Sequence, residues 1–287
     1  MADIQNKYAE YYSHITSGHK WYDLHLKEVW RYRDLIILFT KRTFQLTYKQ
    51  TILGPAWIFL NPFITSVIYT LVFGGIAGIS TDGVPKILFY MSSTAIWTYF
   101  SGCVNKNAHT FTANAGVFGK VYFPRLTVPI SNMLSSIIQF LIQMLMIGVF
   151  FVYYLIKGEV NPNWWACLFI PFILLHLGII GLGFGIIVSS MTTKYRDLSI
   201  LVGFGVQLWM YATPIVYPLS VLGKSVTQTV LLINPITAPV ELYRYALLGC
   251  GEVHAGYLIW SLVVTLIVAV SGIGIFNKVE RTFMDTV

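Results

Sequence analysis

Uncharged apolar stretches long enough to cross a membrane recur along this chain, and they limit its possible folds more than any other feature. A helical bilayer crossing needs about 20 consecutive, mostly apolar residues. Hydrophobic residues make up 56% of the 287 positions and charged residues only 11%, whereas soluble domains carry about 25% charged residues. The sequence therefore predicts an all-α integral membrane protein. Its six transmembrane helices are expected at about 56–76, 87–104, 126–156, 164–191, 198–217 and 256–276.

The distribution of positive charge predicts how these spans are oriented. Fifteen of the 19 Lys and Arg residues fall in the N-terminal segment, in the connections after the second and fourth spans, and in the C-terminal tail. Segments rich in Lys and Arg remain in the cytoplasm. Both termini of this multi-pass chain are therefore expected in the cytoplasm. Topology explains the net charge of +7, and no nucleic-acid partner is expected.

Residues 26–49 predict a helix of a different kind, because apolar and basic side chains gather on opposite faces at 100° per residue. The apolar face holds Leu26, Val29, Trp30, Ile36, Ile37, Phe44 and Tyr48. A helix with this pattern lies along the membrane surface. Leu53, Gly54 and Pro55 follow it, and they predict a turn into the first span, because Gly54 allows the turn and Pro55 cannot continue the helical hydrogen bonds. The predicted regions are a cytoplasmic N-terminal extension (1–25), an amphipathic helix with its turn (26–54) and a six-span transmembrane domain (55–287).

The segment at about 219–250 lies outside the cell in this topology and is too long for a simple turn. Its two apolar stretches, 226–233 and 238–248, are too short to cross, and Pro235 and Pro239 interrupt them. Such stretches are typical of re-entrant or interfacial helices. Glu241 and Arg244 are spaced to pair across one helical turn and brace this external region. An ordinary surface pair fits the spacing equally well.

Several kinds of chemistry are absent from the predicted spans, which contain no Asp, Glu, Lys or Arg. This weakens the case for an ion-coupled carrier. It also weakens the case for a membrane enzyme, which would need carboxylates for metal binding or acid–base catalysis. His176 is the only histidine in the predicted spans, and a lone histidine in a helix bundle is more often part of the packing than catalytic. No GxxxxGK[ST] phosphate-binding sequence occurs, so ATP-driven work requires a separate chain.

Aromatic residues are the remaining feature of the spans. The candidates are Trp97, Tyr99, Phe100, Trp209, Tyr211 and Tyr217. Interfacial belts of aromatic residues are the ordinary explanation. Aromatic faces within a span could instead stack on sugar rings and let a polymer slide past. Three glutamines, Gln139, Gln143 and Gln207, could add hydrogen bonds to such a substrate or hold helices together.

A series of short motifs carries a resemblance to a known family. The motifs are YKQTILGPAW (48–57) with Asn61-Pro62, Phe123-Pro124-Arg125, YRDL (195–198), TPIVYP (213–218), and Asn234-Pro235 followed by Glu241 and Arg244. In this order and spacing, the chain resembles the permease subunits of bacterial ABC exporters of cell-surface polysaccharides, such as O-antigen and teichoic acid. The resemblance covers the chain beyond the first 24 residues.

The resemblance implies a homodimer of six-span subunits in the cytoplasmic (inner) membrane of a bacterium, with two copies of a cytoplasmic ATPase. That partner would use ATP and Mg²⁺, and this chain would bind no cofactor or metal and have no catalytic residue. Helix 26–49 would be the interface helix. The six aromatic residues would lie along a conduit for a lipid-linked polysaccharide, lined largely by the first, second and fifth spans. The residues that couple to the ATPase would be Asn107, His109, Phe111, Phe118, Arg196 and Asp197.

Other functions remain open on the sequence. A related exporter could move teichoic acid, another lipid or a drug. A membrane-embedded enzyme of envelope glycan synthesis would depend on His176, the best acid–base candidate in the spans. A channel or secondary carrier would act without an ATPase. Loss of turnover on substituting His176, or transport that persists without ATP, would favour these alternatives.

Overall fold

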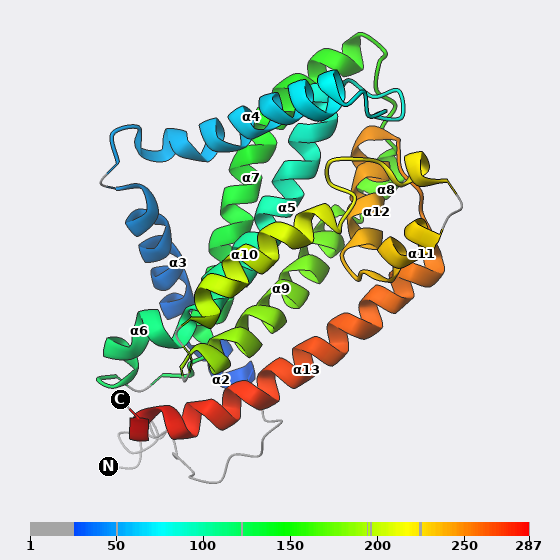
Figure 1. Ribbon diagram of the computed structural model, residues 1–287. Helices are drawn as coiled ribbons and strands as arrows, with labels where there is room; N and C mark the ends of the chain where they lie inside the picture. Colours follow the sequence, from blue (N-terminus) through cyan, green and yellow to red (C-terminus); the bar gives the residue numbers. More distant parts are fainter. Residues whose placement is uncertain are drawn as a thin grey trace, which may run out of the picture.

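The computed structural model describes residues 26–49, 51–121, 123–193, 195, 197–223 and 226–286. These residues form helices joined by loops, with no strand among them (Figure 1). The predicted N-terminal extension (1–25) and the predicted coupling residue Arg196 lie outside the described residues.

Helices cover most of the predicted apolar stretches, but the predicted span 164–191 is divided into two helices, and the helix in the predicted span 198–217 ends early. In chain order they are α2 (Leu26–Arg31), α3 (Arg33–Tyr48), the 3-10 helix η1 (Gly54–Ala56), α4 (Trp57–Tyr69), the π-helix η2 (Thr70–Ile76), α5 (Lys86–Ala108), α6 (Thr110–Phe118), α7 (Thr127–Ile156), α8 (Trp164–Cys167), α9 (Ile170–Thr192), α10 (Leu198–Tyr211), the 3-10 helix η3 (Leu219–Leu222), α11 (Val226–Ile233), α12 (Thr237–Leu248) and α13 (Ala255–Thr286).

In the described part of the chain, four helical segments are long and apolar enough to cross a membrane, and they make this a multi-pass membrane protein. They are Gly54–Ile76, Thr127–Ile156, Ile170–Thr192 and Ala255–Val279. Two of the six predicted spans do not meet the same criteria. Helix α5 has 23 residues but includes Ser, Thr, Asn and Lys, and α10 has only 14 residues because its helix ends at Tyr211.

Helix α5 forms the centre of the bundle and contacts α4, α7, α9, α10 and α12. Sixteen of its 23 residues are buried, and the polar residues Ser92, Ser93, Thr94 and Asn107 are among them. Its neighbour α9 approaches closely at two glycines. A Cβ atom added to Gly181 would lie 2.8 Å from Cys103 Cβ, and one added to Gly185 would lie 2.8 Å from the Val104 carbonyl oxygen. Only glycine permits these helices to pack at this distance.

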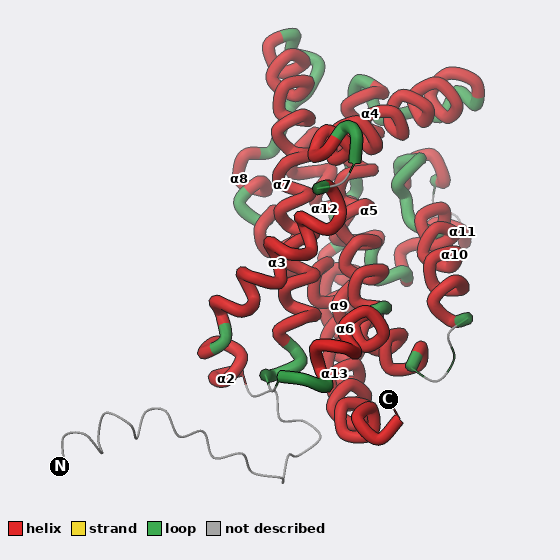
Figure 2. The backbone as a smooth tube through the Cα atoms, turned by 90° about the vertical axis from the view of Figure 1, so that its left-hand side faces the viewer, coloured by secondary structure: helices red, strands yellow, loops and turns green. Residues whose placement is uncertain are grey.

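The two ends of the bundle carry different short helices (Figure 1). One end of the bundle holds α2, α6 and the C-terminal end of α13, as the side view also shows (Figure 2). A hydrophobic cluster that includes Phe39, Phe111, Phe118 and Phe276 joins α3, α6 and α13 there. Helices α8, α11 and α12 lie at the opposite end (Figure 1).

The predicted helix 26–49 is divided at Tyr32, where the backbone has φ −93° and ψ 23°. Helix α3 packs on α7, and Thr40 Oγ1 lies 3.3 Å from the Ser131 carbonyl oxygen. Of the predicted apolar face, Val29 and Ile36 are buried against the bundle, whereas Trp30 is 71% exposed. The segment therefore both packs on the protein and presents apolar side chains outward.

Helices α4 and α10 have large exposed apolar faces. Only Ile58, Pro62 and Ser66 are buried in α4, and only Val206 and Met210 in α10. The exposed apolar residues of the two helices include Ile64, Ile68, Ile200, Leu201, Phe204 and Leu208. In a membrane protein such faces meet lipid or another protein chain.

Candidate functional site

Three of the six aromatic candidates form one cluster between α5 and α10. The ring centroids of Trp97 and Phe100 are 5.3 Å apart, and those of Phe100 and Trp209 are 5.5 Å apart at 89°. Phe184 of α9 extends the cluster, with its centroid 5.2 Å from that of Trp209. Edge-to-face contacts of this kind are favourable for aromatic rings. Trp97 and Phe100 are buried, whereas Trp209 and Phe184 at the edge of the cluster are half-buried.

The other three aromatic candidates lie apart from this cluster. Tyr99 is 2% exposed and donates a hydrogen bond of 2.8 Å to the Leu174 carbonyl oxygen of α9. Tyr217 donates one of 2.9 Å to the Tyr211 carbonyl oxygen, while the Tyr211 side chain is 47% exposed. The structure thus places Tyr99 in the core and Tyr211 on an open face.

The end of α10 is held by Asn234, which the Asn234-Pro235 motif contains. Its Nδ2 donates to the Ala212 carbonyl oxygen (2.8 Å) and to Thr213 Oγ1 (2.9 Å), and its Oδ1 accepts from Trp209 Nε1 (3.2 Å). The same Oδ1 accepts from the Ile236 backbone N–H at 3.2 Å. One carboxamide therefore caps α10 and fixes the turn before α12, a role that the motif did not reveal.

Leu53, Gly54 and Pro55 lie between α3 and α4, where the chain changes direction. Gly54 has φ +52°, a left-handed conformation that disfavours residues with a Cβ atom. Nothing lies within 4 Å of a Cβ added there, so the backbone alone requires glycine. Pro55 follows at the start of η1, where its missing N–H is tolerated.

Helix α6 carries two of the predicted coupling residues, Phe111 and Phe118, and both are buried. Phe111 is fully buried and stacks on Phe276 of α13 with centroids 4.7 Å apart. Its backbone N–H donates to Ser189 Oγ of α9 at 3.1 Å, a contact that the sequence did not suggest. Phe118 is 3% exposed and lies under the Arg125 guanidinium, 5.5 Å from its ring centroid.

The remaining described coupling candidates differ in exposure. Asn107 is fully buried, and its Oδ1 accepts a hydrogen bond of 3.1 Å from Asn132 Nδ2 of α7. His109 is exposed at the junction of α5 and α6, and Asp197 is exposed at the start of α10. Buried side chains thus fix α6 to α9 and α13, while His109 and Asp197 remain accessible to another chain.

Glu241 and Arg244 form a buried ion pair inside α12, each 1% exposed, with a nitrogen–oxygen distance of 2.5 Å. Arg244 also donates to Ser93 Oγ of α5 at 3.1 Å and to the Pro214 carbonyl oxygen, and it lies over the Phe89 ring, 4.4 Å from the centroid. Glu241 accepts from the Glu252 backbone N–H at 3.1 Å. Burial raises the pKa of the Glu241 carboxyl, and the Arg244 guanidinium opposes that rise.

This pair joins α12 to two segments that are distant in sequence, at Ser93 and Pro214, and to the nearby backbone of Glu252. The spacing of Glu241 and Arg244 was enough to predict their pairing, but not their burial. Buried charges are costly unless they are paired and hydrogen-bonded, so the surrounding Ser93, Pro214 and Glu252 contacts are needed to hold them.

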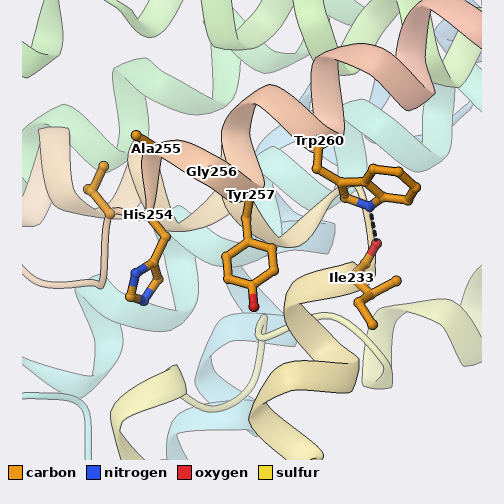
Figure 3. A pocket seen from close by; sticks show the side chains of 7 residues that line it. Ile233, His254, Ala255, Gly256, Tyr257 and Trp260 are labelled. Carbon is orange, nitrogen blue, oxygen red and sulfur yellow. Dashed lines mark hydrogen bonds between the residues drawn. The ribbon is translucent and has the colours of Figure 1, made fainter.

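An open pocket of about 810 Å³ lies where α13 begins, beside the end of α11 (Figure 3). His254, Tyr257 and Trp260 line it, and Trp260 Nε1 donates to the Ile233 carbonyl oxygen at 2.9 Å (Figure 3). This bond ties α11 to α13. Aromatic residues at such a position are typical of the membrane–water boundary.

His176 joins α9 to α13 and is 4% exposed. Its Nε2 lies 2.8 Å from Thr265 Oγ1 and 3.1 Å from Ser261 Oγ. Hydrogen bonds to two hydroxyl groups of the neighbouring helix account for a buried histidine by packing.

Comparison with known proteins identifies the family. The sequence model of the ABC-2 type transporter family matches residues 34–248, from α3 to the end of α12. Two Klebsiella pneumoniae proteins named O-antigen export system permease protein RfbA are 25% and 26% identical over 252 residues, covering 88% of this chain and 94% of each relative. The Myxococcus xanthus protein of that name is 27% identical over 224 residues, covering 76% of this chain and 82% of the relative. Since the family match spans most of its length, this chain belongs to the ABC-2 type transporter family.

Proposed function

We propose that this chain is the membrane-spanning permease subunit of an ATP-driven exporter that moves a lipid-linked polysaccharide, O-antigen or a similar glycan, across the cytoplasmic membrane of a bacterium. The observation that carries the proposal is the family match over residues 34–248, together with relatives named as O-antigen export permeases that align with 88% of the chain. Teichoic acid, another lipid or a drug is the alternative cargo.

In this proposal the chain is a transporter subunit with no catalytic site of its own. Two copies of a separate cytoplasmic ATPase would bind ATP and Mg²⁺, since no GxxxxGK[ST] sequence occurs among the 287 residues. Two copies of this chain would form the conduit. The exposed apolar faces of α4 and α10 are surfaces on which a second copy could pack.

The topology of the proposed subunit has six spans with both termini in the cytoplasm. Helix α5 supplies the second span with 23 residues, and α10 with residues 212–217 supplies the fifth. Helices α11 and α12 would be external re-entrant helices before the last span. The three regions would be the cytoplasmic extension (1–25), the interface helix and turn (26–54) and the transmembrane domain (55–287).

The six aromatic residues would serve the conduit in two ways. Tyr211 lies on the open face of α10, so it could contact a passing glycan directly. Trp97 and Phe100 are buried between α5 and α10, so they could contact a glycan only when α10 separates from α5, whereas Trp209 beside them is half-buried. Tyr99 and Tyr217 would support these helices through their hydrogen bonds to Leu174 and Tyr211.

Coupling to the ATPase would occur at the end of the bundle that holds α6. His109 and Asp197 would make contact from the surface, with Arg196 next to Asp197 in the sequence. Phe111, Phe118 and Asn107 would transmit the movement, because they fix α6 and the end of α5 to neighbouring helices. Rigid helices carry such displacements across a membrane protein.

Reconstitution tests the proposal. The chain is inserted into proteoliposomes with and without its co-purifying ATPase, and translocation of the host's lipid-linked polysaccharide is measured. Transport is expected only with the ATPase and hydrolysable ATP. Transport that persists without ATP would refute the proposal and favour a channel or secondary carrier.

A substitution separates transport from enzymatic activity. His176→Gln keeps a hydrogen-bonding group between α9 and α13 but removes the acid–base group. A permease should retain ATP-dependent export. A membrane enzyme of glycan synthesis should lose its turnover.

A further inference from the structure

A small polar cleft lies among the apolar helices, between α4, α5 and α7. Its volume is about 160 Å³. Its polar lining comes from all three helices and consists of Asn61, Thr65, Thr94, Thr98, Gln139 and Gln143. Polar groups without hydrogen-bond partners are costly in a membrane interior, so a cleft of this composition needs a polar occupant.

Gln143 shows which kind of occupant is required. The side chain is 4% exposed, and its Oε1 has no hydrogen-bond partner among the described residues. Buried polar atoms nearly always find a partner in native proteins. Because a carboxamide oxygen only accepts hydrogen bonds, the occupant that satisfies it must be a donor.

The α4 side of the cleft adds further acceptors. Pro62 has no backbone N–H, so the carbonyl group of Ile58, which also lines the cleft, lacks its usual helical donor. Thr65 donates its hydroxyl proton to the Asn61 carbonyl oxygen at 2.9 Å. Its oxygen lone pairs remain available as acceptors.

The α7 side of the cleft is fixed by hydrogen bonds from Lys106 of α5. Lys106 Nζ donates to Gln139 Oε1 at 2.9 Å and to Ser135 Oγ at 3.2 Å. Hydrogen bonds from a charged donor are stronger than neutral ones, so the Gln139 carboxamide has a fixed orientation. A preorganised polar wall favours specific binding over loose solvation.

An aromatic ring completes the cleft. Trp57 lines it and is 42% exposed, so its indole surface is accessible beside the acceptors. A sugar ring has an apolar C–H face and an edge of hydroxyl groups that donate and accept hydrogen bonds. An acyl chain would leave Gln143 Oε1 unsatisfied, and the described lining contains no carboxylate to balance the charge of a metal cation.

We propose that this cleft is a subsite for one sugar unit of the transported glycan, which stacks on Trp57 and donates hydrogen bonds to Gln143 and its neighbours. The proposal rests on the proposed function, since it names where that substrate is held within each subunit. The carboxamide of Gln143 rotates slightly to present its covered oxygen. When no glycan is bound, several water molecules occupy the cleft, because one needs only about 15 Å³.

Export by the complete transporter with its ATPase tests the subsite. Gln143→Leu and Thr98→Val are each expected to raise the apparent KM for the host's lipid-linked polysaccharide about tenfold, the effect of losing one hydrogen bond to a well-placed group. Thermal stability should be unchanged or higher for Gln143→Leu, because the variant removes an unpartnered buried oxygen. Ser271→Ala, which removes an exposed hydroxyl from α13, is the control and should leave KM unchanged.

A second measurement does not depend on export kinetics. Thr98→Cys places a thiol on an exposed position of the cleft, and its labelling by a small maleimide is followed with and without the polysaccharide, against the parent chain as background. Polysaccharide should slow the labelling of this variant and leave that of Ser271→Cys unchanged.

The outcomes separate the two proposals. Equal labelling with and without glycan, or an unchanged KM in both Gln143→Leu and Thr98→Val, would mean that only water occupies the cleft and would overturn the subsite. If the parent chain itself exports no glycan with its ATPase, the proposed function fails, whatever the cleft binds.

Discussion

Helices α9 and α10 are consecutive, apolar and glycine-bearing, yet the structure uses them in opposite ways. Thirteen of the 23 residues of α9 are buried, and its glycines bring it close to α5 and α13. Only two of the 14 residues of α10 are buried, and nothing lies within 4 Å of a Cβ added to Gly203 or Gly205. Small residues in α9 pack within the subunit, whereas those in α10 lie on an open face.

The difference shows why hydropathy alone does not describe a membrane protein. Lipid and protein interiors are similarly apolar, so a helix facing either one has the same composition. The two helices differ in how closely their small residues pack against neighbouring helices and in the polar contacts that hold each helix. Four substitutions test this contrast, beginning with the largest expected change in stability.

Arg244→Leu should have the largest effect, because Arg244 holds the segment after α10 to α5 through Pro214 and Ser93. Removing one partner of a buried ion pair typically costs about 3–5 kcal/mol. Thermal unfolding in nanodiscs should show a large decrease in Tm, and exposed Arg42→Leu should show little change. The double variant Glu241→Leu with Arg244→Leu should recover part of the loss. If the single variant matched Arg42→Leu, the pair would not secure α10.

Gly185→Ala tests the close packing of α9. Its new Cβ would lie 2.5 Å from Asn107 Cβ and 2.8 Å from the Val104 carbonyl oxygen, so the helices must separate. Overpacking of this kind costs about 1–3 kcal/mol. The matched change Gly203→Ala in α10 has open space and should gain up to ~1 kcal/mol from helix propensity. Equal losses of Tm in the two variants would show that α10 is packed as tightly as α9.

Gly54→Leu tests the entry into α4, the other poorly buried helix. The left-handed backbone at φ +52° costs a residue with a Cβ atom about 1–2 kcal/mol, and no neighbour adds a clash. We expect insertion to persist and ATP-dependent export to stop, because the turn between α3 and α4 is distorted. Gly148→Leu, on α7 with open space, is the control. Normal export by Gly54→Leu would show that export does not require this turn.

Phe204→Ala should have the smallest effect on the isolated subunit. Phe204 is 59% exposed on α10, and substitutions at such positions usually change stability by about 0.5 kcal/mol or less. Phe100→Ala, at a fully buried position of α5, is the comparison and should be strongly destabilising. A similar fall in Tm for both variants would mean that the face of α10 is covered within one subunit.

Much of the helical order could be predicted from the sequence. Residues 226–233 coincide with α11, and 238–248 differ from α12 by one residue. Proline and polar residues mark these ends locally. The break at Gly54 was predictable for the same reason, because glycine and proline restrict the backbone wherever they occur.

The end of α10 could not be predicted in this way. The apolar stretch continues to Tyr217, but the helix ends at Tyr211, where Asn234 caps it from a segment more than twenty residues away. The partners of Arg244 and the polar cleft at Gln143 depend in the same way on contacts between distant helices. Spacing along one helix identifies which residues share a face, but not what that face meets.

The attachment of α10 also has a mechanical consequence. Asn234 and Arg244 fix the backbone at the Tyr211 end, on either side of the turn that follows α10. A force applied near Asp197 would therefore swing the helix about a pivot rather than slide it. Since 14 residues span about 21 Å, a tilt of about 10° would move the Asp197 end by roughly 4 Å and leave the pivot almost still. The displacement would therefore be largest at the end of α10 where the proposed ATPase would act. A small push along the helix axis there would become a sideways movement of α10 that opens a space beside α5.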